Sequence, residues 1–297
     1  MTNGVLILAG PTASGKSDLA IELARRFGAE IVNADSRQIY RGIPIGTAAP
    51  TPDQLAAVPH HLVGFLDPAE RYSAARFSCY AAEVIGSIHA RGKRAIVVGG
   101  TGFYLRALTG DIALASQPNS ALRDRLAREA KIHEPAFLHE WLSLRDPKRA
   151  ADLHSSDRYR VIRALEIALS SSEDVPSQPV NTLASLHIPF LKVFLTLSDD
   201  ELEARIERRT DAMLAAGLFE EAERTGLDAV AANAVGFPQA LAYLRGWCTR
   251  AELRTLLIRA TRRYAKRQQT WFRSEPQTLW LNRVAVARAV QEKLGWD

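Results

Sequence analysis

Eight residues near the start of the chain have the types and spacing of a phosphate-binding loop (P-loop). They follow the apolar run Val5 to Leu8 and precede a helical pattern that begins near Leu19. In such a loop, backbone N–H groups surround a phosphate, the lysine neutralises its oxygens, and the next hydroxyl can bind Mg²⁺. The pattern predicts a diphosphate-binding site, with Ser17 as the metal ligand, at Gly10, Pro11, Thr12, Ala13, Ser14, Gly15, Lys16 and Ser17.

Two further reactive side chains follow apolar segments. The stretch EIVNADSRQIY is typical of a short strand that ends near Asp35, and Thr101 comes just after the predicted strand 95–98. An aspartate beyond the second strand of a P-loop enzyme can act as a general base, so we predict that role for Asp35. The alternative for each residue is a local one, a turn or helix N-cap.

The elements that must position these residues alternate between strand and helix over the first hundred residues. Alternation of this kind predicts an α/β fold, with a doubly wound parallel sheet and a site at the carboxyl ends of its strands. Asp35 and Thr101 both lie just past predicted strand ends, as does the P-loop. We therefore expect all three to meet at one edge of a P-loop NTPase-like core.

The pattern changes to helical spacing over 111–189, where segments such as RYRVIRALEIAL lack strand character. We predict a mostly helical insertion there, ending in a loop rich in Ser and Pro at 170–181. The sheet core then comprises 1–110 and 190–297. The run FLKVFLTL is predicted as a buried strand, followed by helices, a short strand near 279–281 and a final amphipathic helix.

The composition is that of an ordinary soluble globular protein. Of the 297 residues, 47% are hydrophobic and 24% are charged, and the net charge is +5. The first residues carry neither a signal peptide nor a membrane segment, and the two cysteines, Cys79 and Cys248, have no metal-binding spacing. These features predict a cytoplasmic protein without a membrane partner, and the positive charge is a weak indication of an anionic one.

The end of the predicted strand at 95–98 argues against some P-loop classes. Motor ATPases and switch GTPases carry an acidic residue at the end of an apolar strand to hold magnesium. Here the strand runs into VVGGTG, with neither Asp nor Glu. A small-molecule kinase stays open, because its base can follow the second strand.

The segment LIRATRRYAKRQQTWFR predicts a strongly basic helix. Arg259, Arg262, Lys266 and Arg273 are spaced to share one face, and Arg263 and Arg267 flank it. Such charges usually form a solvated helix surface. The segment contains no acidic residue, however, so we interpret the face as a surface for an RNA backbone. A second basic cluster, Arg158, Arg160 and Arg163, lies in the insertion.

The ordered motifs of the chain resemble the tRNA dimethylallyltransferase (tRNA isopentenyltransferase) family in its bacterial form. They are, nearly end to end, GPTASGKS, DSRQIYRGIPIGTAAP, HHLVGFLDP, YSAARF, VGGTGFYLRAL, DRYRVIRALEI, RRTDAMLAAGL, AVGFPQAL and TRRYAKRQQTWFR. The resemblance implies transfer of the dimethylallyl group of dimethylallyl diphosphate to N6 of an adenosine. That adenosine is the one 3′-adjacent to the anticodon, in tRNAs that read codons beginning with U.

The resemblance also implies roles for single residues. Asp35 is the general base, Thr101 touches the substrate near the reacting centre, and Arg209, with Arg208 as the alternative, stabilises the leaving diphosphate. The P-loop holds that diphosphate, and Mg²⁺ is the implied cofactor. Contacts with the tRNA anticodon stem-loop are implied for Asp35, Ser36, Arg37, Gln38, Thr101, Arg123, Tyr159, Arg160, Val161, Ile162, Arg163, Arg263, Lys266 and Arg267.

Two positions depart from the pattern of this family. Ala49 stands where the family commonly has lysine, and Pro238 where it commonly has a basic residue. Each departure removes a positive charge at an expected RNA or diphosphate contact, which bears on tRNA affinity more than on catalysis.

Three other functions are open at this point. A P-loop kinase for a small metabolite explains the loop and Asp35 but leaves the basic helix without a role. A prenyltransferase for free adenine nucleotides would not need the long basic C-terminus, and a non-catalytic RNA-binding module gives Lys16 no role. A monomer is the simplest expectation for a partner as large as tRNA.

Overall fold

The computed structural model describes residues 4–112, 119–170, 181–226 and 229–297. They belong to two compact units, one within 1–112 and 181–297 and the other within 113–180. The helical insertion predicted over 111–189 contains the second unit, and most of its predicted Ser/Pro-rich loop, 171–180, lies outside the described residues. In the described parts of the chain, no helix is both long and apolar enough to cross a membrane.

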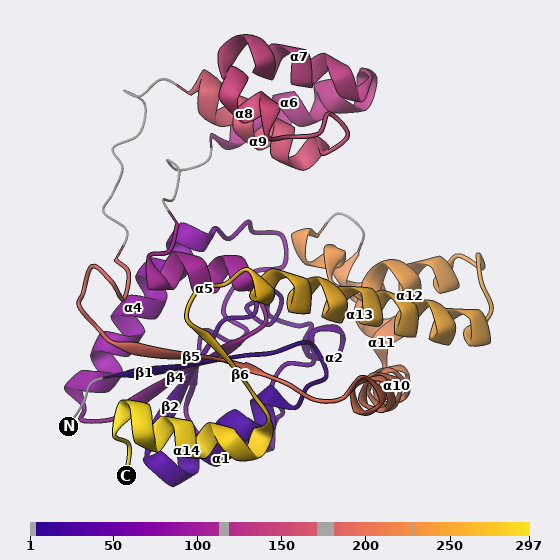
Figure 1. Cartoon of the computed structure of the whole chain (residues 1–297). Helices are drawn as coiled ribbons and strands as arrows, with labels where there is room; N and C mark the ends of the chain where they lie inside the picture. Colours follow the sequence, from indigo (N-terminus) through magenta and orange to yellow (C-terminus); the bar gives the residue numbers. More distant parts are fainter. Residues whose placement is uncertain (1–3, 113–118, 171–180, 227–228) are drawn as a thin grey trace. The chain divides into compact units, whose positions relative to one another are not determined.

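A parallel sheet of six strands forms the centre of the first unit, as Figure 1 shows. The order is β3-β2-β4-β1-β5-β6, and all the strand pairs are parallel. The predicted α/β fold is thereby confirmed. The strands are β1 Val5–Ala9, β2 Ala29–Asn33, β3 His60–His61, β4 Arg94–Gly99, β5 Phe190–Leu195 and β6 Thr278–Leu281.

Helices cover both faces of this sheet, which explains why its central strands are apolar throughout. Helices α1 (Lys16–Phe27) and α14 (Arg283–Leu294) pack on one face, and α4 (Ala74–Ala90) and α5 (Gly102–Thr109) lie on the other (Figure 1). All five residues of β1 are buried. Leu6 and Leu8 of this strand form a core with the inner faces of α1 and α14.

The loops after β1, β2 and β4 meet at the carboxyl edge of the sheet, because β4 pairs with both of the other strands. The approach is closest at Gly99, the last residue of β4. A Cβ atom at that position would overlap the backbone of Ala34. A glycine is therefore required for the loop after β2 to lie against β4.

The remaining helices of the first unit surround this edge. They are α2 Pro44–Thr47, α3 Pro52–Ala57, α10 Asp199–Ala215, α11 Leu218–Thr225, the 3₁₀ turn η1 Val230–Asn233, α12 Phe237–Leu244 and α13 Arg250–Arg273. A capping box of Thr249 and Glu252 begins α13. Buried Lys192 lies beyond its end and pairs with Asp111 at 2.9 Å and with Glu275 at 3.4 Å. Both ends of α13 are therefore fixed.

The second unit is helical in its described residues. Its helices are α6 Ser120–Ile132, α7 Pro135–Arg145, α8 Pro147–Ala151 and α9 Arg158–Leu169. Leu126, Leu138, Leu142 and Leu165 form its small core. Side-chain caps from Asn119, Asp146 and Asp157 begin three of these helices, so local sequence signals define where the helices start.

Gly99→Ala should destabilise the protein because the added methyl group has no space beside Ala34. We expect a loss of about 1–3 kcal/mol in the free energy of unfolding, measured with urea. Gly86→Ala is the matched control, since Gly86 is exposed inside α4 and a Cβ there meets nothing within 4 Å. That change should instead stabilise by about 0.5–1 kcal/mol. Equal stability of the two variants would contradict the close approach at Gly99.

Candidate active site

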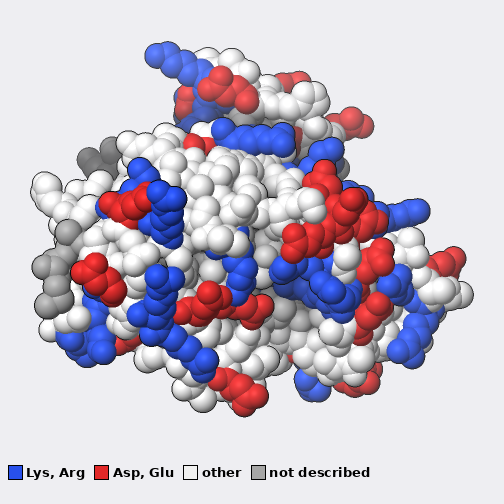
Figure 2. Space-filling model, turned by 60° about the horizontal axis from the view of Figure 1, so that its bottom comes forward, with Lys and Arg blue, Asp and Glu red and all other residues white. Residues whose placement is uncertain are grey.

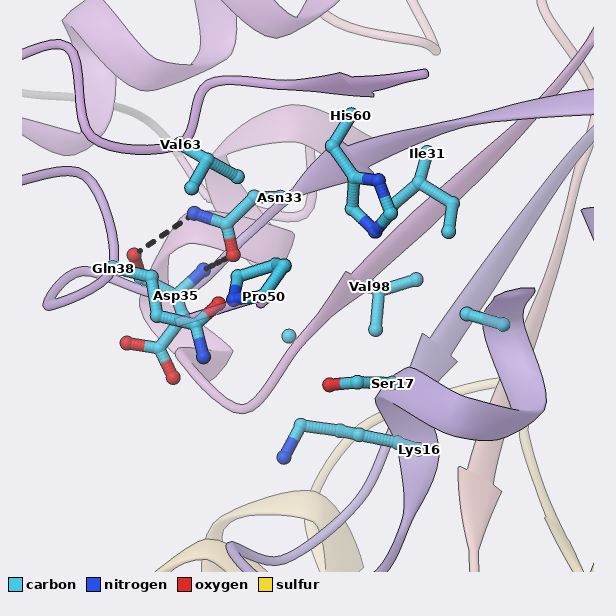
Figure 3. Close-up of a pocket in the computed structure, with 12 residues that line it drawn as sticks. Lys16, Ser17, Ile31, Asn33, Asp35, Gln38, Pro50, His60, Val63 and Val98 are labelled. Carbon is cyan, nitrogen blue, oxygen red and sulfur yellow. Dashed lines mark hydrogen bonds between the residues drawn. The ribbon is translucent and has the colours of Figure 1, made fainter. Parts of the chain in front are cut away.

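An open pocket lies at the carboxyl edge of the sheet. One wall is polar and contains Lys16, the predicted cation, and Asp35, the predicted base. The other wall is mostly apolar. Figure 3 shows the Lys16 amine and the Ser17 hydroxyl directed toward the side where Asp35 and Gln38 lie. The lining residues are Lys16, Ser17, Asn33, Asp35 and Gln38, together with Ala20, Ile31, Pro50, His60, Val63, Val98 and Gly99.

The predicted P-loop joins β1 to α1 through two residues with positive φ, Ala13 at 64° and Gly15 at 80°. The side chain of Lys16 curls back so that its Nζ donates to the carbonyl of Pro11 over 3.3 Å. Arg205, from α10, donates to the carbonyl of Ser14 over 3.3 Å. A loop in this conformation, followed directly by a helix N-terminus, has the geometry that binds phosphate.

Asp35 is held in a turn that orients its carboxylate. Its Oδ1 accepts the backbone N–H of Arg37 over 2.8 Å, and its own N–H donates to Oδ1 of Asn33 over 3.1 Å. Asn33 is in turn fixed to the carbonyl of Leu62 over 2.9 Å. The turn predicted as the alternative is therefore present and uses Oδ1, and the Asp35 side chain also lines the pocket.

Thr101 occupies the N-cap position of α5, but its hydroxyl caps no N–H of that helix. Thr101 Oγ1 instead accepts the backbone N–H of Ser36 over 3.0 Å and lies 3.3 Å from Ser36 Oγ. Thr101 is therefore the N-cap residue, as the alternative predicted, but it caps the helix without a side-chain hydrogen bond. The hydroxyl links the loop after β4 to the loop that carries Asp35.

Gln38 uses its amide to hold the next segment of chain. Its Nε2 donates to the carbonyl of Ala48 over 2.9 Å and to that of Thr47 over 3.3 Å. This segment is anchored from below by Glu221, which accepts the backbone N–H groups of Ile45 and Gly46. The amide of Gln38 is therefore held at a defined place on the pocket wall.

Charges at this edge are poorly hydrated and influence one another. Burial lowers the pKa of Lys16 to about 8, although Asp35 opposes the shift, and the cation of Arg209 lowers this pKa further. Burial likewise lowers the pKa of Arg209, again opposed by Asp35. Arg208, the alternative arginine, is exposed. Of the two arginines, Arg209 is therefore the one whose charge interacts with the charges of Asp35 and Lys16.

Three residues at this site were not predicted from the sequence as site residues, and all of them lie on α10 or α13. Arg205 contacts the P-loop as described above, and Gln268 accepts the N–H of Thr12 over 2.8 Å. Burial raises the pKa of the Tyr264 hydroxyl above the usual range, and the charges of Asp35 and Arg209 also affect this pKa. The spacing held a signal for Arg205, which lies one helical turn before the predicted Arg209.

The basic face predicted for α13 is only partly free of acidic partners. Arg262 pairs with Glu203 and lies 3.6 Å from Glu207, and Arg254 pairs with Asp211 over 2.6 Å. The interpretation of the predicted face as lacking acidic partners is wrong for Arg262, because α10 supplies its carboxylate partners. Arg254 lies before the predicted segment. Acidic and basic side chains are likewise interleaved over the face seen in Figure 2.

The cations expected to contact RNA on α13 lie beside this paired region. Arg263, Lys266 and Arg267 are exposed. The guanidinium of Arg267 lies 5.6 Å from the ring centroid of Tyr264, so the helix presents charge on its outer side and an aromatic group toward Asp35.

The residues of the second unit that were predicted to contact tRNA differ in their exposure and in their ion-pair partners. Tyr159 is 70% exposed, and the guanidinium of Arg123 lies 5.1 Å from its ring. Arg160 pairs with Asp157 over 2.6 Å, and Arg163 with the buried Glu166 over 2.7 Å. Ile162 is half-buried, whereas Val161 is 1% exposed and packs in the core of this unit. The side chain of Val161 is therefore structural.

Of the two departures from the expected family pattern, Pro238 has a local explanation and Ala49 does not. Pro238 lies in the first turn of α12, where proline is well suited because no intrahelical N–H is required. Its neighbour Phe237 is buried against Gly46. Nothing in the structure explains Ala49.

A metal site made entirely of protein groups does not occur within the described residues, where no three His, Cys, Asp or Glu side chains cluster suitably. Ser17 lies beside Lys16 on the pocket wall. One hydroxyl next to a diphosphate-binding loop fits Mg²⁺, which usually keeps several waters and takes further oxygens from phosphate.

Comparisons with known proteins agree on one family. The IPP transferase family model matches residues 38–275, and an isopentenyl transferase model matches residues 3–62. The tRNA dimethylallyltransferase of Geobacter sulfurreducens is 43% identical over 285 residues, which cover 93% of this chain and 91% of that protein. The tRNA dimethylallyltransferase 1 of Citrifermentans bemidjiense is 44% identical over 291 residues, with the same coverage.

Solved structures give the same result. The full-length tRNA isopentenylpyrophosphate transferase of Bacillus halodurans aligns with a TM-score of 0.71 and 34% identity, covering 99% of this chain and 97% of that one. A eukaryotic dimethylallyltransferase acting on tRNA aligns with a TM-score of 0.73 and 27% identity, covering 98% of this chain and 76% of that one.

Lys16→Met should change the pH dependence of stability. The unfolded chain keeps Lys16 protonated up to its ordinary pKa of 10.5, whereas the folded site releases the proton at about pH 8. Between these values the unfolded state binds more protons, so the wild-type fold gains stability as the pH rises. The variant should therefore be more stable than the wild type at about pH 7, and this advantage should shrink toward about pH 10.

Urea unfolding at several pH values measures this difference. Lys93→Met is the control, because Lys93 is exposed and should give no comparable pH dependence. A difference between the Lys16 variant and the wild type that stays constant with pH would contradict the burial of the Lys16 charge.

Proposed function

This chain belongs to the IPP transferase family, and from that premise we propose how its site prenylates tRNA. It is a tRNA dimethylallyltransferase. We propose that the donor is dimethylallyl diphosphate and the acceptor is N6 of the adenosine 3′-adjacent to the anticodon, in tRNAs that read codons beginning with U. The observation that carries the proposal is a pocket lined jointly by Lys16 and Asp35.

The donor fits the pocket by chemical character. The diphosphate is assigned to the P-loop, Lys16 and the N-terminus of α1, which together offer N–H groups and a positive dipole end. The apolar wall, formed by Ala20, Ile31 and Val98, is suited to the dimethylallyl tail. A P-loop recognises phosphate groups and does not require adenosine on the other side of them, so the motif does not imply ATP.

The acceptor is assigned to the Asp35 side of the pocket. The target adenine must leave its stack, which costs about a few kcal/mol and is easiest for a base in a loop. As the N6 nitrogen attacks C1 of the allyl group, the C1–O bond to the diphosphate breaks and a proton leaves N6. Asp35 accepts that proton, and positioned transfer of this kind contributes about 10²–10⁴ in rate.

Negative charge grows on the diphosphate as it leaves. Lys16, Arg209 and the loop N–H groups lie where they can stabilise that charge. Ser17 is the residue assigned to hold Mg²⁺, which when bound supplies further neutralisation of the diphosphate. Thr101 supports the base side by holding Ser36.

RNA is assigned to two surfaces, one in each unit. In the first unit it is the exposed cations Arg263, Lys266 and Arg267 of α13. In the second it is the exposed Tyr159, with the half-buried Arg123 beside its ring, a pair that suits stacking and phosphate contact. We further propose a monomer that acts in the cytoplasm, where both cysteines stay unpaired as in the structure.

Purified protein incubated with unmodified tRNA and radiolabelled dimethylallyl diphosphate should label the RNA. Asp35→Asn should lower kcat about 10²–10⁴-fold and leave tRNA affinity unchanged, because the amide keeps the turn but cannot take the proton. Asp67→Asn is the matched control, since Asp67 also accepts a backbone N–H two residues on, from Ala69 over 2.9 Å, and is outside the pocket. Near-normal kcat in Asp35→Asn would remove Asp35 from the base role.

Arg209→Met should lower kcat about 10²–10³-fold, because one donor to the developing charge is lost. Arg208→Met is the control on the same helix, and it should retain nearly full activity because Arg208 is exposed. Single-turnover rates with saturating tRNA measure both. Equal losses in the two variants would indicate damage to α10 and would contradict the assignment of Arg209.

A further inference from the structure

A glutamine on the basic helix α13 is buried against the catalytic loops. Gln268 is 5% exposed, although its neighbours Lys266 and Arg267 are exposed. Its carbonyl Oε1 accepts the N–H of Thr12 in the P-loop over 2.8 Å, and its Nε2 donates to the carbonyl of Gly100 over 3.0 Å. Both hydrogen bonds are buried. A single side chain therefore joins the loop after β1 to the loop after β4.

The two loops that Gln268 joins belong to opposite halves of the reaction. The P-loop carries Lys16 for the leaving diphosphate. Gly100 precedes Thr101, whose hydroxyl holds the N–H of Ser36 beside Asp35. The spacing between the diphosphate cradle and the base is thus set partly through this amide.

The packing around Gln268 is close enough to define that spacing. A Cβ atom on Gly100 would overlap Nε2 of Gln268, and one on Gly102 would overlap the indole of Trp271, one turn later on α13. The glycines of the loop after β4 therefore allow α13 to lie directly on it. A shift of α13 would move both loops.

We propose that Gln268 is a positioning residue that holds the P-loop at a fixed distance from the Asp35 side of the site. This inference rests on the proposed function. The N–H of Thr12 donates to Gln268 and that of Ser14 to the carbonyl of Pro11, so the diphosphate is assigned to other N–H groups of the loop. Loss of the bridge leaves a buried donor and a buried acceptor without partners, and misplacement by about 1 Å can cost 10²-fold in rate.

Gln268→Leu is the direct test, because leucine has a similar volume and makes neither hydrogen bond. We expect the dissociation constant for inorganic pyrophosphate, measured by calorimetry, to rise about tenfold and kcat to fall about tenfold or more. The KM for tRNA should stay unchanged. Gln269→Leu is the matched control, since the adjacent glutamine forms no bond to the P-loop, and all three values should match the wild type.

Gly100→Ala tests the same contact from the other side, because its methyl group would displace the Gln268 amide while Gln268 itself is retained. It should weaken pyrophosphate binding to a similar degree. The double variant should bind pyrophosphate no more weakly than the worse of the two single variants, since both disrupt one bridge. Circular dichroism checks that each variant is folded.

Three outcomes would overturn the proposal. One is unchanged pyrophosphate affinity in folded Gln268→Leu, or in Gly100→Ala if the leucine variant does not fold. A rise in the KM for tRNA alone would make Gln268 an RNA contact instead, and fully additive losses in the double variant would mean two unrelated defects. A wild-type protein that binds pyrophosphate but does not label tRNA would contradict the proposed function and not the bridge.

Discussion

The site at the carboxyl edge of the sheet depends on a shortage of negative charge there. Lys16 and Arg209 are both half-buried there, and the carboxylate of Asp35 opposes the effect of desolvation on the pKa of each. Two poorly hydrated cations beside one carboxylate favour the binding of a further anion. The fold creates this imbalance by placing the loops after β1 and β2 and helix α10 at one edge. A bound diphosphate would supply the missing negative charge. The burial that lowers the pKa of Lys16 therefore also favours the binding of the anionic donor.

Helix α13 and the second unit each carry a feature that we assign to RNA. In each, a cation lies beside an aromatic ring: the exposed Arg267 beside Tyr264, and the half-buried Arg123 beside the exposed Tyr159. On α13 the outer charges and the buried Gln268 belong to one helix. The helix that we assign to RNA contact is therefore also the one that contacts the P-loop. This shared element gives a physical reason for a long basic C-terminal helix.

Local sequence signals predicted the parallel sheet, the P-loop and the positions of Asp35 and Thr101, because apolar periodicity and loop glycines act within a few residues. The short strand β3, of two residues, has too little periodicity to be recognised. The acidic partners of Arg254 and Arg262 could not be predicted, because they lie on α10, about fifty residues away in sequence. Gln268 was missed because a glutamine in a basic helix has no distinguishing pattern until the two loops that it joins are known.

The central claim is that the diphosphate cradle and the Asp35 carboxylate face one reacting centre. A crystal structure of the protein with an unreactive analogue of dimethylallyl diphosphate measures this directly. The account predicts the diphosphate on the P-loop and C1 of the tail about 5–7 Å from the Asp35 carboxylate, which leaves room for one nitrogen between them at reacting distances. A tail that points away from Asp35, or a diphosphate bound outside the P-loop, would contradict it.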